Sequence, residues 1–380
     1  MYSVEKTRGM NFWKQFDYPI FITVLILSII GIIVIISATK VMPNGVDGSR
    51  IPLVQAIGLV LGIIGALIIC ALDYNDLKTL GIVFYLGCIG LLVAVLFMGH
   101  GENLGSRSWL KVGPLSVQPS EFAKVAFIII VSIYLEKIWE GSRDILNILK
   151  LLVFAAAPIV LIFAQHDFGT TMVFVFILFI MVFISGIPYK YIMILATTFF
   201  MSLPFIWLFA LNDKRKDRIR VFFDPELDPL GSGMNVIRSK IAIGSGQIFG
   251  KGLFNGLQTQ TAGVPVKESD FIFSVVGEEL GFVGCMIIIS LLFFLLIRSI
   301  YIARSARDSY GTFLVVGATA MFAFHTIENI GMTIGLLPVT GLPLPFISQG
   351  VSSMLTNYLA VGIILSVSMR RKKAIFNSDE

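Results

Sequence analysis

The stretch PIFITVLILSIIGIIVIISA, residues 19–38, contains no charged side chain. When helical, a run of about 20 apolar residues matches the hydrocarbon thickness of a bilayer. Lipid offers no water to open backbone groups, and the run lacks the alternation of a barrel strand, so a helix is favoured. The stretch therefore predicts a transmembrane helix.

The same pattern recurs along the chain. We place ten apolar runs, centred near residues 29, 61, 88, 128, 157, 178, 200, 284, 322 and 358. The composition agrees, because 56% hydrophobic and 14% charged residues exclude an ordinary soluble domain. We therefore expect an all-α polytopic membrane protein of about ten transmembrane helices, forming a single domain over residues 1–380.

Basic residues at both ends predict the topology. They are Lys6, Arg8 and Lys14 before the first run, and Arg370, Arg371, Lys372 and Lys373 after the last. Positive charge near short ends marks the cytoplasmic side, so an even number of helices places both termini there. Residues 211–270 then form a large extracytoplasmic loop between helices 7 and 8. The first residues lack a signal-peptide cleavage pattern, so we expect the first helix to stay attached.

The net charge of +5 lies mostly at membrane edges, which favours contacts with anionic membrane lipids and not with nucleic acid. Within the large loop, Arg218 belongs to a basic run, and an amphipathic segment over residues 236–249 places Lys240 beside lipid phosphates. The glycines at 244, 246, 250, 252 and 256 match no phosphate-binding spacing. We interpret them as sites where the backbone approaches a ligand or a neighbouring helix.

The large loop ends at Asp270. If a helix begins there, Asp270, Ser274 and Glu278 share one face at spacings of four residues. A helix cap explains Asp270 but not Glu278, which lies where charge is costly. A surface carboxylate with cations nearby can deprotonate a sugar hydroxyl while the cations stabilise a departing phosphate. The residues alone leave a proton or ion pathway open as the alternative.

Two other predicted outer segments carry polar residues. Arg107, Trp109 and Lys111 follow the third run, and they suit either headgroup anchoring or an anionic lipid substrate. Asp167, in AQHDFGTT, suits either a helix cap or a functional site at membrane depth. No spacing decides between these readings.

The stretch that joins the last two runs, residues 325–355, is rich in proline and glycine. Broken backbone at membrane depth must be buried in protein or line a wet cavity. We expect either a kinked packing element or a cavity wall that receives the Asp270 loop. The histidines and cysteines show no metal-ligand spacing, so no metal site is predicted.

Six ordered motifs resemble the SEDS family, typified by RodA, FtsW and SpoVE. They are GSRSWLKVGPLSVQPSEFAK, AQHDFGTT, VFFDPELDPLGSG, IAIGSGQIFGKGLFNGLQTQ, KESDFIFSVVGEELGFVG and NIGMTIGLLPVTGLPLPFIS. The stretch KGLFNGLQTQ is more similar to the RodA branch, which serves cell elongation. The resemblance covers nearly the whole chain.

The resemblance implies a peptidoglycan glycosyltransferase that polymerises lipid II outside the bacterial cytoplasmic membrane. Asp270 matches the family's essential aspartate, which implies a general base on the acceptor GlcNAc, with undecaprenyl pyrophosphate leaving. Arg107, Lys111, Arg218, Lys240 and Lys251 are hypothesised phosphate contacts. The family implies a class B penicillin-binding protein as partner, and a divalent cation, Mg²⁺ or Mn²⁺, is compatible with a pyrophosphate leaving group.

The chain departs from the family pattern at several places. Glu268 lies two residues later than the usual glutamate, Ser269 stands for threonine, and His166 replaces the proline before Asp167. Gln349 and Val351 replace residues of a common Tyr-Gly-Gly. Two other classes remain open from the residues alone: a lipid II flippase and a non-catalytic scaffold for a penicillin-binding protein.

Overall fold

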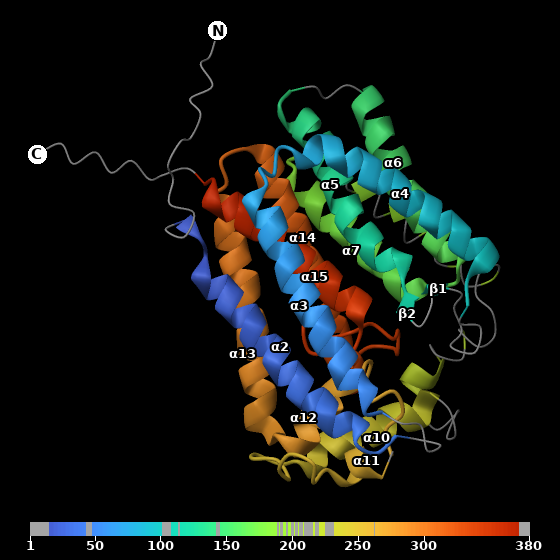
Figure 1. Cartoon of the computed structure of the whole chain (residues 1–380). Coiled ribbons are helices and arrows are strands. Elements are labelled where there is room, and N and C mark those ends of the chain that lie inside the picture. Colours follow the sequence, from blue (N-terminus) through green and yellow to red (C-terminus); the bar gives the residue numbers. More distant parts are fainter. Residues whose placement is uncertain are drawn as a thin grey trace, which may run out of the picture.

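The computed structural model describes residues 15–42, 48–100, 108–112, 115–141, 145–187, 220–224, 232–261 and 263–371, with isolated positions between 190 and 216. The long helices pack as a bundle (Figure 1). They are α2 (Tyr18–Thr39), α3 (Arg50–Ala71), α4 (Leu77–Met98), α5 (Pro119–Trp139), α6 (Ile145–Ala164), α7 (Phe168–Ile184), α13 (Gly281–Arg304), α14 (Ser309–Thr333) and α15 (Val351–Met369). Three shorter helices are α10 (Ser232–Ser245), α11 (Leu257–Gln260) and α12 (Ile272–Glu279).

Seven of the described helices are long and apolar enough to cross a membrane: α2, α3, α4, α6, α13, α14 and α15. α7 is apolar but shorter, and α5 carries four charged residues among its 21. Nine of the ten predicted runs therefore coincide with helices, and the chain is a helical, multi-pass membrane protein. Only isolated positions of the run near residue 200 are described, and most of residues 211–231 lie outside the described residues.

The burial pattern separates core helices from lipid-facing ones. α14 and α15 are the most buried spans, at 72% and 78%, and most of α5 is buried as well. The outer face of α2 instead exposes Ile22, Ile26, Ile29, Ile33 and Ile36 at helical spacing. An apolar stripe of this kind suits contact with lipid tails.

Small residues let α3 pack closely on α15. A Cβ added at Gly62 would meet the ring of Tyr358 at 3.0 Å, and one added at Gly362 would meet the Ala66 carbonyl oxygen at 2.8 Å. Close approach through small residues is a common way for transmembrane helices to associate.

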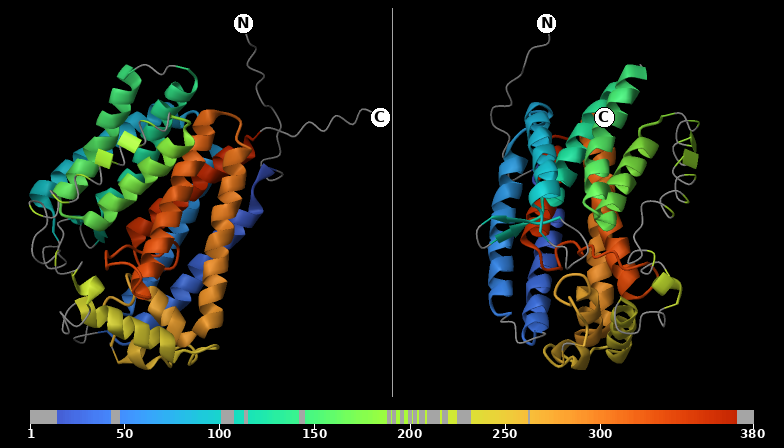
Figure 2. Two further views of the ribbon diagram at one scale, coloured as in Figure 1. Left: turned by 180° about the vertical axis from the view of Figure 1, so that it is seen from behind. Right: turned by 90° about the vertical axis from the view of Figure 1, so that its right-hand side faces the viewer.

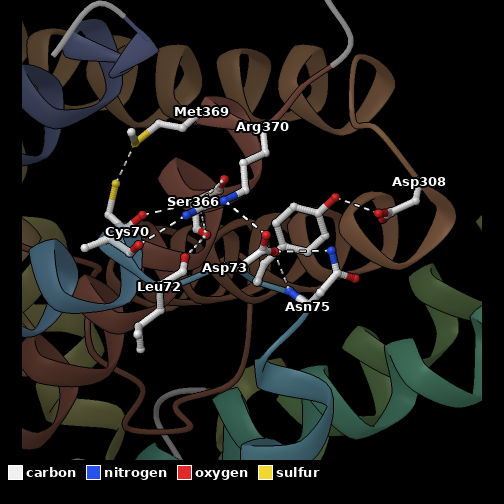
Figure 3. Close-up of polar contacts among 10 residues, drawn as sticks. Cys70, Leu72, Asp73, Asn75, Asp308, Ser366, Met369 and Arg370 are labelled. Atoms are coloured by element: carbon white, nitrogen blue, oxygen red, sulfur yellow. Dashed lines mark hydrogen bonds and ion pairs between the residues drawn. The ribbon is translucent and has the colours of Figure 1, made fainter. Parts of the chain in front are cut away.

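One end of this helix pair is held by Arg370, which follows α15 (Figure 3). Its guanidinium donates to the Ser366 carbonyl at 3.1 Å and to the Cys70 carbonyl at 3.4 Å, and it lies 3.5 Å from Asp73. A cation at helix C-termini offsets the partial negative charge of the last carbonyls. Because Arg370 bonds the last turns of both helices, it ties their ends together.

The short helices α10, α11 and α12 gather at the opposite end of the bundle (Figure 2). The prediction of close backbone approach at the loop glycines is confirmed for two of them. A Cβ added at Gly246 would collide with the Gly277 carbonyl oxygen, and one at Gly250, where φ is +80°, with the Glu279 carbonyl oxygen. The segment after α10 therefore packs directly on the backbone of α12.

The structure corrects two details of the all-α prediction. A small antiparallel hairpin, β1 (Leu110–Val112) and β2 (Leu115–Val117), follows α4, with Leu110 opposite Val117. In addition, α12 begins at Ile272, so Asp270 is not its N-cap. A tight turn precedes α12, which is why the predicted polar stripe from Asp270 does not form.

Candidate active site

Asp270 lies in the turn that leads into α12. The backbone amides of Ser269, Asp270 and Phe271 all converge on the carbonyl oxygen of Val266, at 3.1 to 3.3 Å. The Ser269 hydroxyl also donates to Oδ1 of Asp270 at 2.9 Å. The turn thus orients a half-buried carboxylate through local bonds.

The other oxygen of Asp270 faces the segment between α14 and α15. A Cβ added at Gly341, where φ is +78°, would lie 3.1 Å from Oδ2. This segment has no regular helix over residues 336–350, and Leu342, Leu344 and Phe346 are buried within it. The proline-rich connection and the Asp270 loop are therefore in contact.

The structure places Glu278 away from Asp270. Its side chain is fully buried, and Oε1 accepts from the Gln258 amide at 2.9 Å and from Lys251 Nζ at 3.0 Å. Oε2 accepts from the amide and the hydroxyl of Thr259, both at 2.9 Å. Ser274, also buried, donates to the Phe271 carbonyl. The carboxylate of Glu278 thus holds the α11 loop onto α12.

Electrostatics support that role for Glu278. Burial by itself would raise the pKa of the carboxyl, but hydrogen bonds from Gln258, Lys251 and Thr259 outweigh it, so the pKa lies below its ordinary value. Nearby, Lys267 donates to the carbonyls of Thr259 and Val41, and burial lowers the pKa of its ammonium group. Both groups serve the internal bonding of the loop.

A buried polar cluster in the helical core escaped the sequence analysis. Lys124, only 1% exposed, donates to Glu121 Oε1 at 2.8 Å and lies 2.9 Å from Nε2 of His325. The other ring nitrogen of His325 is 3.2 Å from the Pro343 carbonyl. The available signal was the spacing of Glu121 and Lys124 within an apolar helix, since ionisable residues at that depth rarely lack a role.

Asp167 caps α7, accepting from the Thr170 amide at 3.1 Å, and it also accepts from the Gln118 side chain at 3.3 Å. The cap reading is confirmed, and Gln118 links this cap to the start of α5. Close by, Gly169 packs against the carbonyl of Thr340, whose hydroxyl donates to the buried Glu328 at 2.8 Å. The α7 terminus therefore borders the same segment that Asp270 touches.

The remaining predicted contacts belong to several different elements. Trp109 pairs with His100 in a β-bridge, Lys111 lies exposed on β1, and exposed Lys240 of α10 lies against Gly335 at the end of α14. Lys251 is 32% exposed beside Glu278. Arg107 and Arg218 lie outside the described residues.

Within the described ranges, no three His, Cys, Asp or Glu side chains gather in a way that could hold a metal ion. This part of the chain thus provides no protein-built site for the divalent cation that the resemblance allows.

Comparison with known proteins places the chain among bacterial wall-synthesis proteins. It is 35% identical to a probable peptidoglycan glycosyltransferase FtsW of Trichlorobacter lovleyi, over 95% of both chains. It is 36% identical to the peptidoglycan glycosyltransferase MrdB of Escherichia coli, over 76% of this chain and 77% of the relative. A solved chain of a peptidoglycan synthase complex has the same fold, with a TM-score of 0.75 and 26% identity, over 93% of this chain and 97% of the other.

A family model also covers almost the whole chain. Residues 18–373 match the family model FtsW/RodA/SpoVE, described as "cell cycle protein". The chain belongs to the FtsW/RodA/SpoVE family.

Proposed function

We propose that the chain is a peptidoglycan glycosyltransferase that polymerises lipid II into glycan strands on the outer face of the cytoplasmic membrane. The observation that carries the proposal is the placement of Asp270. Its half-buried carboxylate is oriented by the turn and lies against Gly341, in a chain whose relatives are named for this activity. The elongation role, as opposed to division, is part of the proposal.

In the proposed reaction, Asp270 takes the proton of the acceptor GlcNAc 4-hydroxyl. The hydroxyl oxygen then bonds to the anomeric carbon of the donor MurNAc while the bond to the pyrophosphate oxygen breaks. Undecaprenyl pyrophosphate leaves with the electron pair. A single displacement inverts the anomeric carbon. It needs one base, which Asp270 supplies, together with stabilisation of the leaving phosphate.

Cations and polar groups that the sequence analysis singled out are the proposed substrate contacts. The phosphate contacts are Arg107, Lys111, Arg218, Lys240 and Lys251, and Trp109 and Asp167 line the approach of the lipid. Ser274 and Glu278 act indirectly, because their polar groups bond within the loop and α12. Alanine substitution of each cation should lower the polymerisation rate, and an unchanged rate removes that residue from the set.

The proposed topology has about ten transmembrane helices in a single domain. It places both termini in the cytoplasm and residues 211–270 outside as one large loop. A class B penicillin-binding protein is the proposed partner, since a polymerase must be matched with a transpeptidase that crosslinks its product. The solved neighbour described as a peptidoglycan synthase complex supports this pairing.

The test compares wild type with Asp270→Asn, each purified with its cognate penicillin-binding protein and incubated with labelled lipid II. Both must elute as folded particles before the products are separated on a gel. Long glycan from wild type and none from the variant supports the proposal. Polymer from both removes Asp270 as the base. No polymer from either, while a control polymerase works, favours a flippase or a scaffold.

A further inference from the structure

Three hydrogen-bond donors hold the backbone around Asp270. The carbonyl oxygens of the three successive residues from Glu268 to Asp270 each accept a hydrogen bond from the α14–α15 region. The amide of Gln349 donates to Glu268 O at 2.9 Å, and the hydroxyl of Ser348 donates to Ser269 O at 2.6 Å. Three consecutive carbonyls anchored in this way leave the turn little freedom to rotate.

Asn329 supplies the third bond. Its side-chain amide donates to Asp270 O and to Leu342 O, both at 2.8 Å. The opposite amide orientation would aim Oδ1 at two carbonyl oxygens, so the assignment of Nδ2 as double donor follows from chemistry. Asn329 is fully buried, and its Oδ1 has no partner in the described part of the chain. The side chain of Asn329 therefore joins the Asp270 turn to the segment between α14 and α15.

Other hydrogen bonds hold Ser348 in place. Its hydroxyl accepts from the Leu344 amide at 2.8 Å, so the proton is directed at Ser269 O. Gln55, buried in α3, donates to the Ser348 carbonyl at 3.1 Å and accepts from the Gly350 amide at 3.0 Å. The support for the Asp270 turn therefore extends into the packed pair of α3 and α15.

We propose that Asn329 and Ser348 are positioning residues for the Asp270 carboxylate, holding the backbone of its turn so that the carboxylate keeps the direction that proton removal requires. The inference rests on the proposed function of Asp270. Displacing a catalytic group by about 1 Å can lower a rate by about 100-fold even when substrate still binds. Weakening these bonds should consequently affect turnover more than binding.

The test uses the full-length chain purified with its cognate penicillin-binding protein. Steady-state polymerisation of lipid II is measured for wild type, Ser348→Ala, Ser348→Thr, Asn329→Leu and Asp270→Asn. Ser132→Ala is the matched control, because Ser132 is equally buried but donates only to Ile128 O within its own helix. Size exclusion and thermal unfolding provide the folded fraction by which each rate is divided.

Ser348→Ala should lower kcat by roughly 10-fold to 100-fold at an unchanged KM. Ser348→Thr, which keeps a hydroxyl, should recover most of the rate, and Ser132→Ala should match wild type. If Asn329→Leu does not fold, the serine series carries the test. A merely structural role would lower the folded fraction and leave kcat per folded molecule intact.

Three results overturn the proposal: wild-type kcat in Ser348→Ala, a rise in KM alone, or no recovery in Ser348→Thr. These apply when wild type polymerises and Asp270→Asn does not. No polymer from wild type, or polymer from Asp270→Asn, instead refutes the proposed function, and the positioning role falls with it. The two failures are therefore distinguishable in one experiment.

Discussion

Replacing Glu278 with glutamine tests whether this buried carboxylate builds the loop. Four donors converge on its two oxygens: the Gln258 amide, Lys251 Nζ, and the amide and hydroxyl of Thr259. A glutamine keeps its acceptor oxygen beside the Lys251 ammonium and turns its NH₂ group toward the amide and hydroxyl of Thr259. Two donors then lose their acceptor.

The expected size of the effect follows from these bonds. Hydrogen bonds to charged groups contribute about 1.5–3 kcal/mol each, so losing two predicts a destabilisation of about 3–6 kcal/mol. Thr259→Val removes one bond and should cost about half as much. Lys251→Met should cost less than about 1 kcal/mol, because the 32% exposed lysine is screened by solvent.

Denaturant titration of the purified variants measures the free energy of unfolding, and hydrogen exchange reports on residues 251–260. We expect Glu278→Gln to lower the free energy of unfolding most, Thr259→Val less and Lys251→Met least. Protection from hydrogen exchange should be lost first in the loop. Equal stability of Glu278→Gln and wild type, with unchanged exchange, would refute the structural role. The carboxylate would then be available to contact substrate.

Three further predictions concern stability. Lys124→Met should lower the free energy of unfolding by about 3–5 kcal/mol, measured by denaturant titration, because it leaves the buried Glu121 carboxylate unpaired. Adding Glu121→Gln to this variant should restore part of the lost stability. No restoration would contradict the pairing. Gly246→Ala should lower the melting temperature, because the added Cβ clashes with α12. Gly244→Ala is the control: its Cβ would meet nothing within 4 Å, so stability should stay the same or rise by up to about 1 kcal/mol. Equal effects of the two substitutions would contradict the packing. Because the pKa of Glu278 is lowered in the folded state, its ionised carboxylate stabilises the fold fully above about pH 4.5. This stability is lost as the pH falls through the lower folded-state pKa. A melting temperature that depends on pH as strongly in Glu278→Gln as in wild type would contradict this.

Much of the architecture was predictable from local patterns. The apolar runs are long enough to span a bilayer, and nine of them coincide with described helices. Pro119 at the start of α5 and Asp167 as the cap of α7 follow from rules that involve only neighbouring residues. The close approach at Gly246 was also predictable, although the sequence did not identify the carbonyl that it meets.

The role of the carboxylates was harder to predict. An expected helix from Asp270 grouped it with Glu278, but the turn around Val266 moved the helix start to Ile272 and separated the two groups. Local spacing does not indicate such a turn, because a valine rarely adopts the positive φ of 50° that Val266 has. The contact between Lys124 and His325 likewise joins two residues that are 201 positions apart in the chain.

The sequence by itself thus determined that this is a helical membrane protein, and its motifs identified Asp270 as the residue to examine. Only the tertiary structure decided what holds that residue. The bond from Ser348 to Ser269 spans 79 positions, and the bond from Asn329 to Asp270 spans 59. Helical periodicity reports neighbours within about one or two turns, whereas these contacts exist only after α14, α15 and the loop have packed together.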